Sequence, residues 1–283
     1  MQIDAHQHFW SYNEHDYVWM GTDMDGLKRD FAPNDLAPLL KSIGAAGSVS
    51  VQARQMVEET EYLLGLAHKY DWILGVVGWL DFRSKSLEAD LDRFGSDGKL
   101  KGLRELIHDM PDPEYCVSSE HKQAINRLGR HNLTYDLLLR PEHIEPATRL
   151  VDAFPQQPFV IDHIGKPDIA REEIDPWRAR MKEIARRENV YCKLSGMVTE
   201  AQVNNWTAEQ FVPYLDHCLE VFGSSRVMIG SDWPVCTLAG DYQAVMGIVM
   251  DYATSLSTSE QSQVLGKTCA EFYGIPPEKG GTL

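Results

Sequence analysis

The sequence has no run of about 20 apolar residues, the length that a helix needs to cross a bilayer, so we expect no membrane span. Its first residues, MQIDAHQ, lack the basic and apolar segments of a signal peptide, so none is expected. Basic residues are scarce: 27 lysines and arginines stand against 42 acidic residues, a formal net charge of −15. Because nucleic acid is bound by basic surfaces, this balance argues against nucleic acid as a partner.

Cysteine is also rare. The five cysteines are an odd number and form no Cys-x-x-Cys pair, so we expect neither a disulfide framework nor a cysteine zinc site. A reducing cytoplasm is the expected compartment. No Gly-x-Gly-x-x-Gly sequence follows an apolar run, which argues against the main rival fold, an open doubly wound sheet with a phosphate-binding loop.

What the sequence does contain is a regular alternation of apolar runs and amphipathic segments. We interpret the apolar runs as strands at 3–9, 47–53, 73–80, 100–106, 134–139, 158–164, 190–195 and 226–231. We interpret the amphipathic segments as helices at 58–70, 87–94, 119–131, 144–154, 178–188 and 209–222. Eight such units in 283 residues predict an α/β fold, a (β/α)8 TIM barrel in a single domain. The long aromatic segment from Trp10 to about Gly44 is expected to be a loop over the active face.

Two histidines lie two residues apart in the first predicted strand. Side chains at i and i+2 point to the same face of a strand, so His6 and His8 should project together. The last predicted strand ends in Asp232. A closed barrel would bring the first and last strands together, and these three side chains with them.

Active sites of such barrels lie at the carboxyl ends of the strands. The other polar residues that fall there are Gln52, Arg54, Arg104, Glu105, Asp162, His163, Lys193 and Ser195. His108 lies just beyond the fourth strand and is interpreted as solvated or structural. Each candidate has a structural alternative. His163 could be a core histidine, and Asp232 could cap the turn before Pro234. Arg104 and Glu105 could pair with each other or with neighbours, and Lys193 could be a surface side chain.

The set of His6, His8, His163 and Asp232 is chemically coherent. Imidazoles and a carboxylate can hold one divalent cation, typically zinc, and leave a position open for water. Such an ion lowers the pKa of bound water to about 7, and an aspartate can then accept the proton. In a metal-free alternative, the histidines polarise a carbonyl directly and Asp232 alone activates the water.

Five segments together resemble the amidohydrolase superfamily. They are HQHFW at 6–10, KGLRELIHDMPDPEY at 101–115, DHIGKP at 162–167, YCKLSGMVTE at 191–200 and MIGSDWPVC at 228–236. More closely, they are similar to its branch of sugar-lactone hydrolases, such as the L-fuconolactonases and L-rhamnonolactonases. The resemblance runs from about residue 3 to Tyr273 and implies a (β/α)8 barrel. It also implies that His6, His8, His163 and Asp232 form the active site.

The sequence departs from the wider superfamily pattern at two strand ends. Arg104 and Glu105 stand where a carbamylated lysine would be expected, and no histidine ends the fifth strand. Both departures argue against a binuclear site and leave either one metal ion or none, as in relatives of this branch that work without metal. Glu105 is a further candidate ligand for the ion.

The resulting hypothesis is hydrolysis of a small aldonolactone, such as L-fucono- or L-rhamnonolactone, to the hydroxy acid. The residues expected to contact this small-molecule substrate are Gln52, Arg54, Arg104, Lys193, Trp10 and Trp233. Three alternatives stay open: a hydrolase of a dicarboxylate lactone, a zinc-dependent non-oxidative decarboxylase of an aromatic acid, and a barrel that binds a sugar acid without turnover. The oligomeric state does not follow from the sequence.

Overall fold

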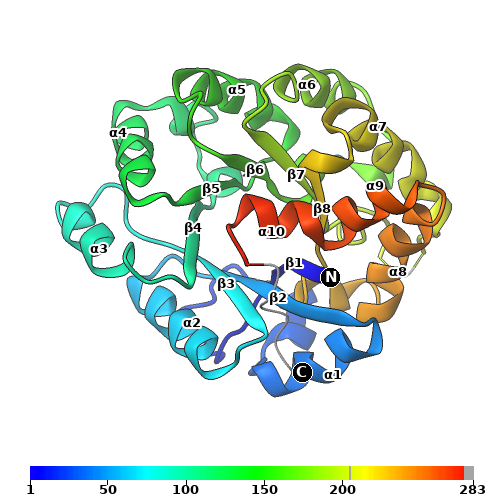
Figure 1. Cartoon of the computed structure of the whole chain (residues 1–283), viewed down its shortest axis with the longest axis horizontal. Helices are drawn as coiled ribbons and strands as arrows, with labels where there is room; N and C mark the ends of the chain where they lie inside the picture. The colour runs from blue at the N-terminus through cyan, green and yellow to red at the C-terminus, as the bar shows by residue number, and fades with distance from the viewer. Residues whose placement is uncertain (204, 277–283) are drawn as a thin grey trace.

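The computed structural model describes residues 1–203 and 205–276. In this part of the chain, eight parallel strands form one sheet in the order β1 to β8, curled into a nearly closed barrel (Figure 1). The strands are β1 Gln2–Gln7, β2 Ala45–Val51, β3 Ile73–Gly78, β4 Leu100–Glu105, β5 Thr134–Leu137, β6 Phe159–Ile161, β7 Val190–Leu194 and β8 Val227–Ile229. Each overlaps the apolar run that predicted it, so the predicted TIM barrel is confirmed.

Most helices connect the strands and surround the barrel, and the last one, α10, lies across the end of the barrel at which the N-terminus is found (Figure 1). They are α1 Pro33–Ser42, α2 Val57–Lys69, α3 Leu87–Phe94, α4 Ser119–Leu128, α5 Ile144–Ala153, α6 Trp177–Ile184, α7 Val212–Phe222, α8 Tyr242–Ala253, α9 Thr258–Ser262 and α10 Thr268–Phe272. The predicted helices correspond to α2 through α7. The sequence interpretation missed α1, which lies in the segment expected to be loop, and it missed the helices after β8.

The missed helices have weak or atypical patterns. Helix α1 contains Pro38 and buries few side chains, among them Leu36 and Leu40. Helix α8 carries apolar residues on most of its faces, because it is packed between the barrel and its neighbours, so no polar face marks its period. No helix in the described residues is long and apolar enough to cross a membrane.

Several strands are almost entirely apolar because both of their faces are covered. All six residues of β3 are buried, and so are all residues of β6 and β8. One face lies against the surrounding helices and the other against the barrel interior, which explains the near-continuous apolar runs in the sequence.

The barrel closes at a seam between the end of β1 and the residues that follow β8. The amide of Asp232 donates to the carbonyl of His6 at 2.8 Å, and the amide of His8 donates to the carbonyl of Trp233 at 2.7 Å. Asp4 stabilises the same seam from β1: its carboxylate accepts from the amide of Ser231 at 2.9 Å and from the hydroxyl of Ser231 at 2.6 Å. The seam therefore joins the two segments that carry the predicted active-site residues.

Asp4 is fully buried and also accepts a hydrogen bond from the Tyr242 hydroxyl of α8 at 3.1 Å. Burial raises the pKa of this carboxyl to about 6. The replacement Asp4→Ala would leave the donors of Ser231 and Tyr242 without an acceptor in a dry interior. We expect it to lower the free energy of unfolding at pH 7 by about 2–4 kcal/mol. Urea denaturation would measure this.

The matched control is Asp71→Ala, which removes an exposed carboxylate before β3 and should change stability by less than about 0.5 kcal/mol. Equal effects of the two replacements would contradict the role of Asp4 at the seam.

Candidate active site

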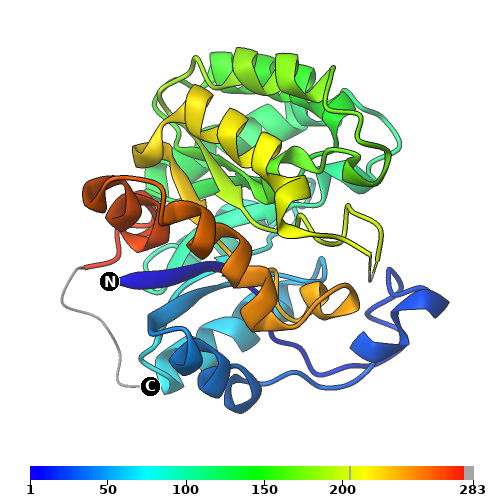
Figure 2. The same ribbon diagram turned by 90° about the vertical axis from the view of Figure 1, so that its right-hand side faces the viewer.

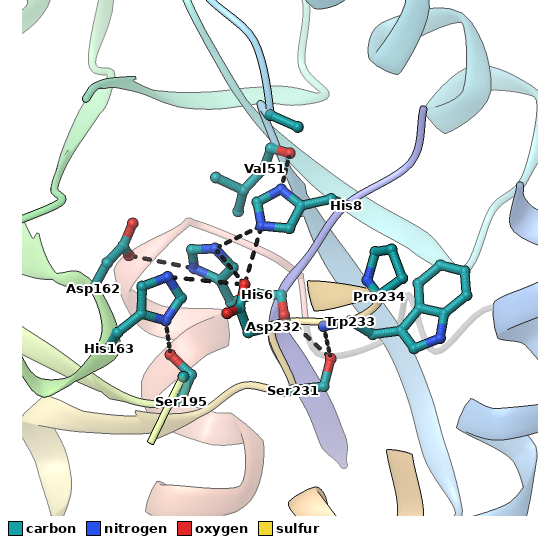
Figure 3. A network of polar contacts seen from close by, with 12 residues as sticks. His6, His8, Val51, Asp162, His163, Ser195, Ser231, Asp232, Trp233 and Pro234 are labelled. Carbon is teal, nitrogen blue, oxygen red and sulfur yellow. Dashed lines mark hydrogen bonds and ion pairs between the residues drawn. The ribbon is translucent and has the colours of Figure 1, made fainter. Parts of the chain in front are cut away.

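The four predicted active-site residues converge at the carboxyl end of the barrel (Figure 3). His6 lies in β1 and His8 just beyond it, His163 follows β6, and Asp232 follows β8. His163 and Asp232 have φ angles of 53° and 59°, in the left-handed region that residues other than glycine rarely adopt. Such strained backbone is characteristic of functional sites, where the surrounding structure imposes it.

One carboxylate oxygen is at the centre of this cluster. Oδ1 of Asp232 lies 3.2 Å from Nε2 of His8 and 3.9 Å from Nε2 of both His6 and His163. The Nε2 atoms of His6 and His8 are themselves 3.2 Å apart. Three imidazole nitrogens and a carboxylate thus face one small volume.

The opposite ring nitrogens have their own partners. Nδ1 of His8 lies 2.7 Å from the carbonyl oxygen of Val51, and Nδ1 of His163 lies 2.9 Å from the hydroxyl of Ser195. A carbonyl can only accept, so Nδ1 of His8 carries the proton and donates it. Nε2, on the other side of the His8 ring, faces Oδ1 of Asp232 at 3.2 Å. Outer partners of this kind fix both the tautomer and the orientation of a ring.

The electrostatics favour neutral rings beside a charged carboxylate. Burial lowers the pKa of His6 and of His163 well below the ordinary value for histidine. Burial alone would raise the pKa of Asp232, but the neighbouring His163 and His8 outweigh it and hold this pKa below the ordinary value. A carboxylate that stays ionised near neutral pH can accept a proton from water.

A buried charge network lies beneath the cluster. Nη1 of Arg104 donates to Asp162 at 2.8 Å, and Nζ of Lys193 donates to Asp136 at 2.6 Å and lies 3.0 Å from Asp162. Burial alone would raise the pKa of Asp162, but Lys193 and His6 hold it well below the ordinary value. The alternative that made Lys193 a surface side chain is wrong, because two carboxylates compensate its charge in the interior.

The same network contacts His6 from both sides of its ring. Nζ of Lys193 lies 3.2 Å from Nδ1 of His6, and Nη1 of Arg104 lies 3.3 Å from its Nε2. The guanidinium of Arg104 also donates to the side-chain oxygen of Gln52 at 2.9 Å. Arg104 and Glu105 were expected to pair with each other or with neighbours: the arginine pairs with a neighbouring carboxylate, Asp162, and not with Glu105.

A cavity of about 690 Å³ opens above the cluster, and its floor includes His8, Arg104, His163 and Asp232. Loops after the strands supply the walls, which include Trp19, Asp23, Met24, Asp109, Arg140, Lys166 and Glu200. Three cations and four carboxylates therefore line the cavity when Arg104 and Asp232 are counted. Arg104 and Lys166 are paired with Asp162 and Glu200.

Several residues predicted to contact substrate lie outside the cavity lining. Gln52 and Lys193 are in the network below the floor. The guanidinium of Arg54 points to Asp16 and to Glu59 in α2. The structure thus places three of the predicted polar contacts beside the site and not in its walls.

The two tryptophans predicted to contact substrate are packed into the core. Trp10 donates its indole N–H to the carbonyl of Arg29 at 2.9 Å and is 1% exposed. Trp233 packs edge-on against Phe9 and Phe31. Trp10 thereby supports the segment 11–30 that follows it, and Trp233 lies at the seam. A different tryptophan, Trp19, lines the cavity.

Glu105 also lies apart from the cluster. Its Oε1 accepts from the indole N–H of Trp79 at 3.0 Å, and its other oxygen is buried without a partner among the described residues. Burial raises the pKa of Glu105 to about 7. Two buried groups of side chains place their potential metal-ligand atoms within 4.8 Å of one another. One consists of His6, His8 and Asp232, and the other of His6, Asp162 and His163; Glu105 belongs to neither.

Sequence reasoning assigned no role to two kinds of residue. Asp162 and Ser195 were found at strand ends by the rule that selected His163, but were not included in the predicted site. His108, Arg140 and Lys166 reach the cavity from loops whose course has no periodic signal, and His108 was interpreted as solvated or structural.

The amidohydrolase family model matches residues 3–275 of the sequence. The chain belongs to this family. As a member of the amidohydrolase family it is 35% identical to L-fucono-1,5-lactonase from Burkholderia ambifaria, over 99% of this chain and 97% of that protein. It is 36% identical to L-fucono-1,5-lactonase from Burkholderia multivorans, over 98% of this chain and 97% of that protein.

Among solved structures, a Burkholderia multivorans amidohydrolase with bound zinc superimposes with a TM-score of 0.94. It is 36% identical, and the match covers 98% of this chain and 100% of that one. The donor set of this amidohydrolase chain fits such an ion, because His6, His8 and Asp232 place ligand atoms within 4.8 Å of one another. The tautomer of His8, fixed by Val51, leaves its Nε2 available as a ligand.

Glu105 offers a test of the electrostatics beside the site. A carboxyl whose pKa is raised in the folded state binds its proton more tightly there than in the unfolded chain. The free energy of unfolding should therefore fall as pH rises from about 4.5 to about 7. Glu105→Gln removes this titration. At pH 8 we therefore expect the free energy of unfolding of the variant to exceed that of the parent chain by roughly 1–3 kcal/mol, and at pH 5 we expect little difference. Urea denaturation at both pH values measures the difference.

The control is Glu120→Gln, which replaces an exposed carboxylate at the start of α4 and should give the same small difference at both pH values. A pH-independent difference for Glu105→Gln would contradict the raised pKa.

Proposed function

We propose that this chain hydrolyses the lactone of a small deoxy-sugar acid to the free hydroxy acid, with L-fucono-1,5-lactone as the first substrate to test and L-rhamnonolactone as the second. The observation that carries the proposal is the convergence of the Nε2 atoms of His6, His8 and His163 on Asp232 at the floor of an open cavity. The full-length similarity to two L-fucono-1,5-lactonases supports the substrate class.

The charges of the cavity favour a neutral substrate. Four carboxylates and three cations line it, so a doubly charged lactone would find no excess of positive charge. Mixed polar groups on apolar walls, such as those of Trp19 and Leu138, suit a sugar ring that carries hydroxyl groups and a methyl group. A dicarboxylate lactone is the weaker candidate for this reason.

In the proposed mechanism, the lactone carbonyl lies over the histidine cluster and a water molecule lies beside Asp232. Asp232 accepts a proton as the water oxygen attacks the carbonyl carbon. The guanidinium of Arg104 on the cavity floor, together with ring N–H groups of the histidine cluster, stabilises the negative charge that develops on the carbonyl oxygen. The bond from the carbonyl carbon to the ring oxygen then breaks, the ring oxygen receives the proton from Asp232, and a hydroxy acid leaves.

The residues that would hold a zinc ion are His6, His8 and Asp232, with His163 nearby. When bound, the ion would polarise the carbonyl and lower the pKa of the attacking water to about 7. The proton-accepting role of Asp232 and the positioning of the rings by Val51 and Ser195 are the same with or without it.

Asp232→Asn should abolish the proton acceptor while preserving size and the hydrogen bonds of the seam, which involve its backbone. We expect kcat to fall by about 10³-fold or more, with little change in melting temperature. Steady-state hydrolysis and calorimetry measure the two quantities. Asp92→Asn, an exposed aspartate of α3, is the control and should keep full turnover. Near-normal turnover of Asp232→Asn would contradict the mechanism.

A pH-indicator screen across aldonolactones, dicarboxylate lactones and aromatic lactones tests the substrate. We expect acid release to be fastest on a deoxy-sugar 1,5-lactone. A parallel arm with chelator, followed by zinc readdition, measures how much of the rate depends on the ion. Turnover of no lactone, together with carbon dioxide release from an aromatic acid, would replace the proposal by a decarboxylase.

A further inference from the structure

One wall of the cavity is formed by an excursion of the chain between β1 and α1. Residues 11–30, here called the first loop, leave the barrel after Trp10 and return at Phe31. Those two residues exchange backbone hydrogen bonds of 3.1 and 2.9 Å, which close the base of the first loop. In Figure 2 the first loop projects from the side of the barrel opposite the N-terminus of β1.

The first loop contributes Trp19, Asp23 and Met24 to the cavity wall. The indole nitrogen of Trp19 is buried and has no hydrogen-bond partner among the described residues. The place of the first loop therefore affects what the cavity can bind.

Arg54 connects the first loop to the barrel. Its Nη1 makes a short ion pair with Asp16 of the first loop, and its Nε donates to Glu59 of α2 at 2.9 Å. Its guanidinium also lies over the ring of Tyr17, 5.5 Å from the centroid. Within residues 1–203 and 205–276, this is the one ion pair between the first loop and the rest of the chain.

The barrel side of this connection is rigid. Glu59 is 1% exposed, and its carboxylate accepts from the amides of Ala53 at 2.5 Å and Arg54 at 3.1 Å. It thereby holds the turn at the end of β2, and Ala53 of that turn lines the cavity. The side chain of Arg54 is 17% exposed, so water screens its ion pairs less than those of a fully exposed arginine.

We propose that Arg54 is a positioning residue for the substrate wall: by bridging Asp16 and Glu59, it holds the first loop so that Trp19, Asp23 and Met24 meet the sugar part of the lactone. Arg54 does not touch the substrate in this proposal. The sequence-based prediction differs, because there Arg54 binds the substrate directly. The kinetic consequence of this positioning role rests on the proposed lactonase activity.

The kinetic test compares Arg54→Met, Asp16→Asn and the double variant. A residue that acts only through the first loop should affect affinity more than chemistry, because the floor of the site is unchanged. We expect each single variant to raise KM about tenfold, because each loses a partly buried charge-assisted hydrogen bond. Its kcat should stay within about twofold of the value for the parent chain. The double variant should be no worse than either single one. Arg54→Lys, which reaches one carboxylate but not both, should be intermediate.

Arg187 offers a matched control. It bridges Asp152 and Glu183 at 2.8 Å each and is 22% exposed, but it lies between α6 and the start of β7, at the other end of the barrel. Arg187→Met and Asp152→Asn should leave KM unchanged. A raised KM in Arg54→Met with a normal KM in Asp16→Asn would overturn the proposal in favour of direct substrate contact. Normal KM values in both would overturn it as well.

A second readout does not depend on the lactonase activity. Amide hydrogen exchange in residues 11–30 should be faster in Arg54→Met and in Asp16→Asn than in the parent chain, and unchanged in Arg187→Met. If no lactone is hydrolysed but exchange rises in this pattern, the positioning role stands and the proposed function fails. If exchange in the first loop is unchanged in both variants, the positioning role fails whatever the substrate is.

Discussion

Asp4 holds β1 against the segment that follows β8, and the active-site cluster depends on that contact. β1 carries His6 beyond Asp4, and His8 follows directly after its last residue. The opposite segment carries Asp232 next to Ser231, the residue that Asp4 binds. The backbone hydrogen bonds of His6 and His8 go to the same segment. Closing the barrel and assembling the cluster are therefore a single structural event, and a shift in register at the seam would separate the carboxylate from the histidines.

The interior below the cluster determines its protonation. Lys193 and Arg104 are cations on the barrel interior, and each has a carboxylate partner there. Removing one member of such a buried network would leave an uncompensated charge, so the members constrain one another. The cations also oppose protonation of His6, which burial already disfavours. An ionised Asp232 is the state in which this carboxylate can act as a general base.

The positions of site residues could be predicted from the sequence where they follow from local spacing or from the closure of the barrel. Period-two spacing placed His6 and His8 on one face, and barrel closure placed Asp232 beside them. The direction of the other strand-end side chains could not be predicted in the same way. Lys193 lies within β7 and turns inward, a direction set by the register of that strand with its neighbours. Arg54 lies in the turn beyond β2, where no strand register applies, and it points toward the first loop. Loop residues such as Arg140 had no periodic signal at all.

This difference reflects how the site is built. Its floor consists of residues on or next to strands, fixed by the closed sheet and by fully buried partners such as Val51 and Asp162. Its walls come from loops, and the first loop is joined to the barrel by an ion pair on a partly exposed arginine. Substitutions in the walls can therefore alter which lactone fits without disturbing the groups that act on the carbonyl. Within such a barrel, the floor fixes the type of reaction and the loops select the substrate.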